Sequence, residues 1–291
     1  MNNFLLCFKR LEIFLVFFLV LANYVFCSLQ AFGEEDEITY QSPQKKNLKV
    51  LVLIIASDNT EAYLELQKVW KAYMHSCPEH IEVYFIKGNP DLPTSFEIRG
   101  DDLFVKTEEG YIPGIINKTI LSMEAMLPRF KEFDFVLRTN LSSFYVFPRL
   151  LNFIRNLPPK KCYCGFQMHI PASWTPKLGF INFVSGAGFI LSIDLVEMLI
   201  REKCYLLKYK CDLPDDVLIG LFFQKRSILS LPAERMDIGT LEEWNAQKDN
   251  ISENAFHFRA KNHTNLRTAA ESFSDELHIN QELLKIFYQH P

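Results

Sequence analysis

The segment LKVLVLIIAS, residues 48–57, constrains the fold more than any other part of the sequence. It is a near-continuous run of leucine and β-branched residues, which is typical of a strand buried on both faces of a sheet. A helical pattern follows over residues 60–75, with Val69 and Trp70 among its apolar positions, and then comes the strand-like IEVYFIKG, residues 81–88. Together they predict a βαβ unit and place the chain in the α/β class.

The alternation continues along the chain. Within residues 113–130 the sequence predicts a helix that starts after Pro113 and Gly114 and ends near Pro128. FDFVLRT (133–139) predicts a third core strand, and FPRLLNFIRNL (147–157) another helix. This order predicts a single domain over residues 49–291, with a mostly parallel central sheet flanked by helices. Ligands are then expected at the carboxyl ends of the strands.

The second half of the chain predicts further elements and a turn. Residues 177–203 read as an aromatic strand, a turn of small residues, a short strand and a helix. The turn comprises Ser185, Gly186, Ala187 and Gly188, and glycines at such a turn let backbone or ligand approach closely. Residues 213–225 predict a helix, and the sequence after about residue 230 is less regular.

The N-terminus predicts export. Lys9 and Arg10 precede an apolar run, residues 13–29, and the acidic cluster 34–37 follows, which places the N-terminus on the cytoplasmic side if the segment is not cleaved. Residues 1–31 are either a signal peptide or a signal anchor, and 32–48 a polar stalk. We therefore expect an exported or membrane-anchored domain, in the Golgi or ER lumen of a eukaryote, or in the periplasm or secreted by a bacterium.

Composition and cysteine spacing exclude some functions. The 31 basic and 35 acidic residues give a net charge of -4, and no basic stripe with interleaved aromatics occurs, so nucleic acid is not an expected partner. A phosphorylated small molecule needs only a few local cations. Cys162 and Cys164 lack a second ligand pair and favour a structural role over metal binding, whereas Cys204 and Cys211 could form a local disulfide.

Five segments, in order, resemble motifs of the beta-1,3-galactosyltransferase and Fringe superfamily of GT-A glycosyltransferases. The first strand is followed by LQKVW, similar to the family's Arg-x-x-Trp signature, and GYIPGIINKT (110–119) is similar to its Leu-Lys-Thr helix. Residues 138–145, RTNLSSFY, take the place of the metal strand Lys-Thr-Asp-Asp-Asp-Val-Phe-Val. SGAGFILS (185–192) resembles Ser-Gly-Gly-Gly-Tyr-Val-Leu-Ser, and DDVLIG (215–220) resembles Glu-Asp-Val-x-x-Gly.

The resemblance implies a reaction and its participants. It implies transfer of a hexosyl-type unit from a nucleotide-sugar donor to a glycan, glycolipid or glycoprotein acceptor, with inversion and with Asp216 as the base. In this superfamily a late histidine often completes the metal and diphosphate site, and His257 takes that position. The strand that should hold manganese or magnesium reads Asn140, Leu141 and Ser142, which lack the carboxylates these hard cations favour. We therefore expect reduced metal dependence.

Without that metal, the charge on the leaving diphosphate needs other partners. The candidates are cations, namely Lys118, Arg138, Arg259 and Lys261. Asp58, at the end of the first strand, is a candidate for nucleotide contact.

The same residues have plainer interpretations. Asp215 and Asp216 could cap a helix, His257 could be a core histidine, and Asn140 and Ser142 could cap a turn rather than line a nucleotide pocket. Asp101 and Asp102 imitate a metal motif but are interpreted as a loop and strand start. Three functions remain open: a glycosyltransferase, a catalytically silent GT-A-like domain that binds a glycan or nucleotide, and an anchored interaction protein.

Overall fold

The computed structural model describes residues 48–207, 213–261 and 269–289, all within one compact unit, Ser42–Pro291. The predicted signal segment, nearly all of the stalk, and Cys211 lie outside the described residues. In the described ranges, no helix combines the length and hydropathy needed to cross a membrane. The described cysteines, Cys77, Cys162, Cys164 and Cys204, form no disulfide with one another, and the proposed pairing of Cys204 with Cys211 stays a prediction.

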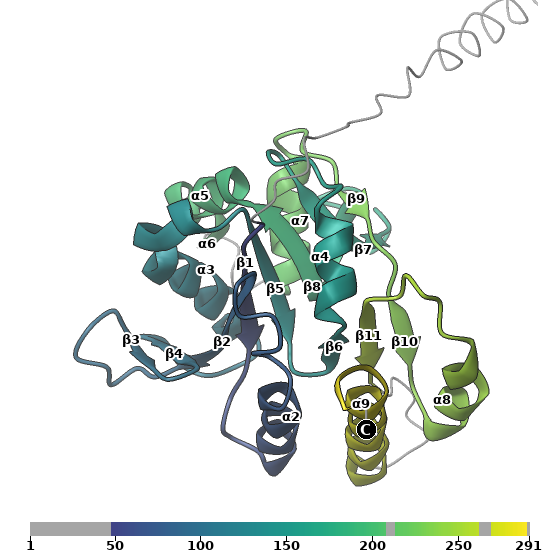
Figure 1. The fold of residues 1–291 in the computed structure, drawn as a ribbon. Coiled ribbons are helices and arrows are strands. Elements are labelled where there is room, and N and C mark those ends of the chain that lie inside the picture. The colour runs from purple at the N-terminus through teal and green to yellow at the C-terminus, as the bar shows by residue number, and fades with distance from the viewer. Residues whose placement is uncertain (1–47, 208–212, 262–268, 290–291) are drawn as a thin grey trace, which may run out of the picture. The chain divides into compact units, whose positions relative to one another are not determined.

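An eight-stranded sheet forms the centre of the domain, in the order β3-β4-β2-β1-β5-β8-β7-β9 (Figure 1). Its strands are β1 (Val50–Ile55), β2 (Ile81–Gly88), β3 (Phe96–Arg99), β4 (Asp102–Val105), β5 (Phe135–Asn140), β7 (Tyr163–Ile170), β8 (Ile181–Ser192) and β9 (Leu231–Pro232). The strands β4, β2, β1 and β5 are parallel, whereas β8 is antiparallel to both its neighbours. The sheet is therefore mixed, and the predicted parallel arrangement holds for one half of it.

Helices cover both faces of this sheet, which confirms the α/β class. The helices α3 (Gly114–Met126), α5 (Ile193–Arg201) and α7 (Asp215–Gln224) pack on one face, and α2 (Glu61–Lys71) and α4 (Phe147–Ile154) pack on the other. The strand β1 contributes alternate side chains to the two cores, and all six of its residues are buried. This is the burial expected of a continuous apolar strand in the middle of a layered sheet.

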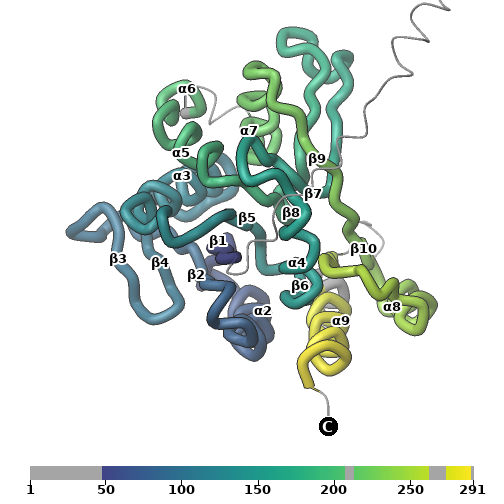
Figure 2. Tube along the Cα trace, turned by 45° about the horizontal axis from the view of Figure 1, so that its top comes forward, coloured from purple at the N-terminus to yellow at the C-terminus, as the bar shows by residue number. Residues whose placement is uncertain are grey.

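The C-terminal part is more regular than the sequence suggests. The strands β6 (Ser143–Tyr145), β10 (Met236–Ile238) and β11 (His257–Ala260) form a small second sheet, accompanied by α8 (Leu241–Gln247) and α9 (Ala269–Tyr288). Tyr288 fastens α9 to the region after β5, because its hydroxyl donates to the Tyr145 carbonyl (2.8 Å) and accepts from the Phe147 amide (2.7 Å). Figure 2 shows α9 lying close to β6 and α2.

The predicted turn at Ser185–Gly188 is wrong, since these residues lie inside the continuous strand β8. Their small size has another cause. A Cβ atom at Gly188 would lie 1.9 Å from the Tyr145 hydroxyl, and one at Gly186 would lie 3.0 Å from the nearer Asp216 carboxylate oxygen. Gly186 and Gly188 have to be small because side chains from other elements pack against the backbone of β8 at these positions.

Candidate active site

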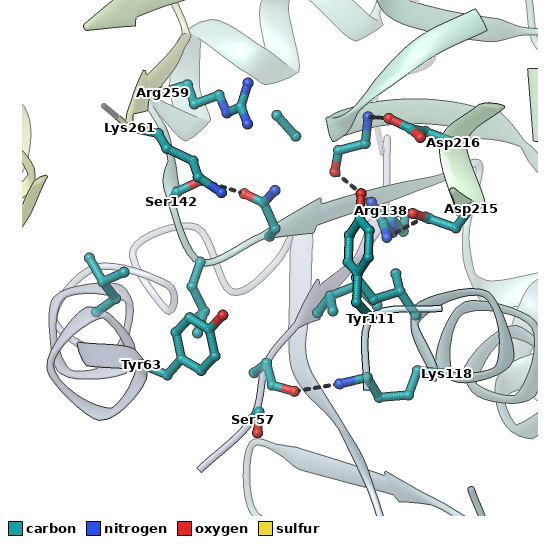
Figure 3. Close-up of a pocket in the computed structure, with 18 of the residues that line it drawn as sticks. Ser57, Tyr63, Tyr111, Lys118, Arg138, Ser142, Asp215, Asp216, Arg259 and Lys261 are labelled. Atoms are coloured by element: carbon teal, nitrogen blue, oxygen red, sulfur yellow. Dashed lines mark hydrogen bonds and ion pairs between the residues drawn. The ribbon is translucent and has the colours of Figure 1, made fainter. Parts of the chain in front are cut away.

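A cavity of about 460 Å³ opens at the carboxyl ends of β1 and β5. The middle of β8, the start of α7, the loop before α3 and the end of β11 complete its wall (Figure 3). Eleven of the residues singled out from the sequence line it: Lys118, Arg138, Asn140, Ser142, Ser185, Gly186, Ala187, Asp215, Asp216, Arg259 and Lys261. The site therefore lies where open α/β sheets usually bind ligands.

Arg138 and Asp215 form a buried ion pair beneath this cavity. A guanidinium nitrogen lies 2.5 Å from the Asp215 carboxylate, and the other two nitrogens donate to the Gly186 carbonyl (2.5 Å) and the Thr119 hydroxyl (3.4 Å). The two side chains are only 3% and 8% exposed. Burial raises the pKa of Asp215 to about 6, against the lowering effect of Arg138. Arg138 is thus a structural partner of Asp215, which leaves it less available for an anionic ligand.

Asp216 has a different environment from its neighbour. One carboxylate oxygen accepts from the Gly186 amide (2.7 Å) and the other from the Val217 amide (2.9 Å). The side chain is half-buried at the cavity wall, and within the described part of the chain it has no ion pair. Two backbone amides from different elements therefore hold this carboxylate in place and leave it open to a ligand.

Lys118, like Arg138, is already paired with a carboxylate. Its ammonium donates to Glu109 (2.6 Å) and to the Ala56 carbonyl (2.9 Å), with 3% of the side chain exposed. Burial lowers the pKa of Lys118, and the Glu109 hydrogen bond partly offsets this. Glu109 also accepts from the Gly88 amide (2.6 Å). The pair therefore ties the loop before α3 to the ends of β1 and β2.

Arg259 and Lys261 are cations of another kind. Neither side chain forms an ion pair within the described residues. Nε of Arg259 is buried and has no hydrogen-bond acceptor there. Burial, and then the charge of Arg235, lowers the pKa of Arg259. A buried polar group without a partner is costly, so this wall is suited to an anion.

The residues in place of the family's acidic triplet do not fit manganese or magnesium. The Ser142 hydroxyl donates to the Asn140 amide oxygen (2.9 Å), and neither group carries a negative charge. The pocket wall also includes the cations Arg259 and Lys261, which oppose a divalent cation. Among the residues described, no group of three or more histidine, cysteine or acidic side chains could hold a metal.

The structure places three predicted residues, Asp58, Gly188 and His257, outside the cavity lining. Asp58 pairs with Lys87 (2.8 Å) and accepts a hydrogen bond from Gln67 (3.1 Å). Burial tends to raise the pKa of Asp58, but these two partners hold it below its usual value. His257 is buried, stacks on Tyr145 with ring centroids 4.3 Å apart, and has Nε2 3.2 Å from the Ser143 hydroxyl. Burial, followed by nearby arginine charges, lowers the pKa of His257 well below its usual value. This environment is that of a core histidine.

Other predicted positions have structural roles. Gly188 faces Tyr145 and His257 rather than the cavity. Asp102 begins β4 and pairs with Lys87 (3.1 Å), as expected of a strand start. Cys162 and Cys164 are buried, and burial raises the pKa of the Cys164 thiol to about 12, which suits the structural interpretation.

Several residues near the cavity are not among the site residues predicted from the sequence. Tyr63, Glu109 and Tyr111 line it. Arg235, 2% exposed, lies behind the wall and donates to the Ser185 hydroxyl (2.8 Å) and to Asp237 (2.7 Å). Glu109 and Arg235 occur in irregular segments without a motif, so only the folded chain reveals them.

No family model and no curated protein matches the sequence. Among solved structures, the chain is similar to a glycosyltransferase involved in the glycosylation of the major capsid of PBCV-1, with 8% identity and a TM-score of 0.43 over 79% of this chain and 98% of that one. It is also similar to mouse xyloside xylosyltransferase 1 in its apo form, with 10% identity and a TM-score of 0.41 over 75% and 98% of the two chains. At these TM-scores the similarity carries no argument about the chemistry of the site.

Proposed function

We propose that the chain is a GT-A-type glycosyltransferase that moves a hexosyl-type unit from a nucleotide sugar to an acceptor hydroxyl with inversion. The observation that carries the proposal is the pairing, in one cavity, of a carboxylate without an ion-pair partner, Asp216, with the two open cations Arg259 and Lys261. Glycosyl transfer needs a base for the acceptor and positive charge for the leaving diphosphate. In this proposal Asp216 serves the first requirement, and Arg259 and Lys261 serve the second.

The proposed step assigns each group a role. The Asp216 carboxylate takes the proton of the acceptor hydroxyl while the acceptor oxygen forms a bond to the anomeric carbon. The bond from that carbon to the diphosphate oxygen breaks, and its electron pair stays on the diphosphate. Arg259 and Lys261 stabilise the resulting negative charge, so the step requires less help from a metal than the acidic triplet of the resembled family would imply.

The roles of Arg138 and Lys118 change in this proposal. Both were candidates for diphosphate contact, but each has a carboxylate partner less than 3 Å away. We propose that Arg138 acts through Asp215 and Gly186, which flank the base, and that Lys118 acts through the loop that it holds. They are positioning residues.

The test is turnover by the full-length chain across UDP-, GDP- and CMP-sugars, with manganese and with EDTA. We expect donor hydrolysis or transfer that survives EDTA, and an Asp216→Asn variant that loses about 10²–10⁴-fold in kcat. Lys261→Ala should also slow the reaction, whereas Lys160→Ala, an exposed lysine outside the cavity, should not. Turnover abolished by EDTA would contradict the proposed use of Arg259 and Lys261.

A silent GT-A-like binding domain is the second candidate. The observation in its favour is that two of the four predicted cations are already neutralised, which leaves fewer groups for the leaving diphosphate. It predicts nucleotide-sugar binding without turnover, and an Asp216→Asn variant that binds as the wild type does. Loss of all nucleotide-sugar binding would refute both candidates.

A further inference from the structure

Tyr111 occupies an unusual position in the cavity. Its side chain is 66% exposed, yet it stands in a wall where Asp215, Asp216 and Lys118 are the other main features (Figure 3). Tyr63 lies on the opposite side, near Ser57. The cavity thus presents an open aromatic ring beside the carboxylate proposed as the base.

The hydroxyl end of Tyr111 lies within the field of the two aspartates. Burial of the hydroxyl, and then the charges of Asp216 and Asp215, raise the pKa of Tyr111. Tyr111 stands beside Asp215 and Arg138, on the same side of the cavity as Asp216 and across from Arg259 and Lys261 (Figure 3). A ligand group held against this ring would face the base rather than the two cations on β11 and after it.

The backbone that carries Tyr111 is fixed at several points. Its carbonyl accepts from the Ile115 amide (3.1 Å) at the start of α3, and the nearby Glu109 binds both the Gly88 amide and the Lys118 ammonium (each 2.6 Å). An open ring on a fixed loop loses little further conformational freedom when a ligand binds. The loop is thus held in place before any ligand arrives, and only the side-chain torsions of Tyr111 remain to be ordered.

The chemistry of the position favours a saccharide. A pyranose has an apolar face of C–H groups and a rim of hydroxyls. An aromatic ring can bury the face, and adjacent carboxylates can accept from the rim. An isolated serine, threonine or lipid hydroxyl offers the base a proton but has no flat apolar face for the ring. We infer that Tyr111 is the platform for the acceptor and that the acceptor is a saccharide. That the bound saccharide is the acceptor rests on the proposed function, whereas the contact between Tyr111 and a saccharide does not.

Saccharide binding can be measured without turnover. The probe is a panel of methyl hexosides and methyl pentosides, titrated into the full-length chain and followed by saturation-transfer NMR. We expect at least one glycoside to bind the wild type, Tyr111→Ala to weaken that binding at least tenfold, and Tyr111→Phe to retain it within about threefold. Trp174→Ala is the matched control, because Trp174 is 78% exposed and does not line the cavity; its binding should equal that of the wild type.

Two results would overturn the inference: no glycoside binds the wild type, or Tyr111→Ala binds glycosides as tightly as the wild type. Neither result affects donor hydrolysis dependent on Asp216, so the proposed function could stand without the platform. Conversely, Tyr111-dependent glycoside binding by a chain that turns over no donor would support the saccharide site and refute the catalytic role of Asp216.

Discussion

Replacing Arg138 with methionine should make the stability of the domain more sensitive to pH. In the wild type, the pKa of Asp215 is already about 6, because burial outweighs the attraction of Arg138. Without the guanidinium, that pKa must rise further, since the same burial would then act unopposed and Asp216 lies beside it. Removing one partner of a buried ion pair typically costs about 3–5 kcal/mol, part of which is the burial of the remaining charge.

The size of the pH-dependent part follows from linkage. A carboxyl whose folded-state pKa is raised contributes stability that is present below its unfolded pKa, 3.8, and is lost as the pH rises through the folded pKa. For the wild type this loss ends near pH 6. In Arg138→Met it continues above pH 6 at up to about 1.4 kcal/mol per pH unit, so the variant should lose up to about 2 kcal/mol more than the wild type between pH 6 and 7.5.

Urea denaturation followed by tryptophan fluorescence, at pH 5.5 and at pH 7.5, measures this effect. The double variant Arg138→Met with Asp215→Asn has no carboxyl left to titrate, so it should lose the extra pH dependence and be more stable at pH 7.5 than Arg138→Met alone. Arg129→Met is the matched control, because Arg129 pairs with Glu82 at the half-exposed surface and the pKa of Glu82 lies below this pH window. If Arg138→Met is destabilised equally at both pH values, the reasoning about Asp215 is refuted.

Two further predictions concern packing and titration elsewhere. A Cβ atom at Gly220 would lie 2.3 Å from Cβ of Phe183, so Gly220→Ala should force α7 from β8 and cost about 1–3 kcal/mol in urea denaturation, whereas Gly110→Ala meets open space and should be neutral or slightly stabilising. His257 has a lowered pKa, so the wild type should lose stability as the pH falls below 6.5, by up to about 1.4 kcal/mol per unit; His257→Gln should lack this acid sensitivity, and an unchanged slope would contradict the burial argument.

The elements that the sequence predicts best are those with local signals. The run that became β1 is buried on both faces, and the helix that follows it is capped by Thr60, whose hydroxyl accepts from the Tyr63 amide (3.2 Å). The helix with Asp215 and Asp216 in its first turn also forms as predicted. In each case neighbouring residues in the chain determine the structure, so periodicity and end signals are sufficient.

The misplaced features depend on contacts between distant segments. The short strand β11 pairs with β10 on one side and, on the other, with β6, which lies about a hundred residues earlier in the chain, so none of these strands has a sequence pattern of its own. The small residues of β8 looked like a turn because glycine favours turns, but Gly188 is small to admit Tyr145. A sequence shows that a position must be small without showing which side chain will press on it.

The same limit applies to the charges of the site, and it changes how the missing acidic triplet should be understood. The sequence identifies four cations and two adjacent aspartates, but only the fold shows that Asp215 neutralises Arg138 and that Glu109 neutralises Lys118. The other charged residues that line the cavity are Asp216, Glu276, Arg259 and Lys261, two of each sign. Adding a metal at Asn140 and Ser142 would bring two more positive charges beside those cations, with no carboxylate at these two positions to bind it. The loss of the triplet and the open cations at the end of β11 are therefore mutually consistent, since loss of the triplet without those cations would leave the diphosphate with too little positive charge.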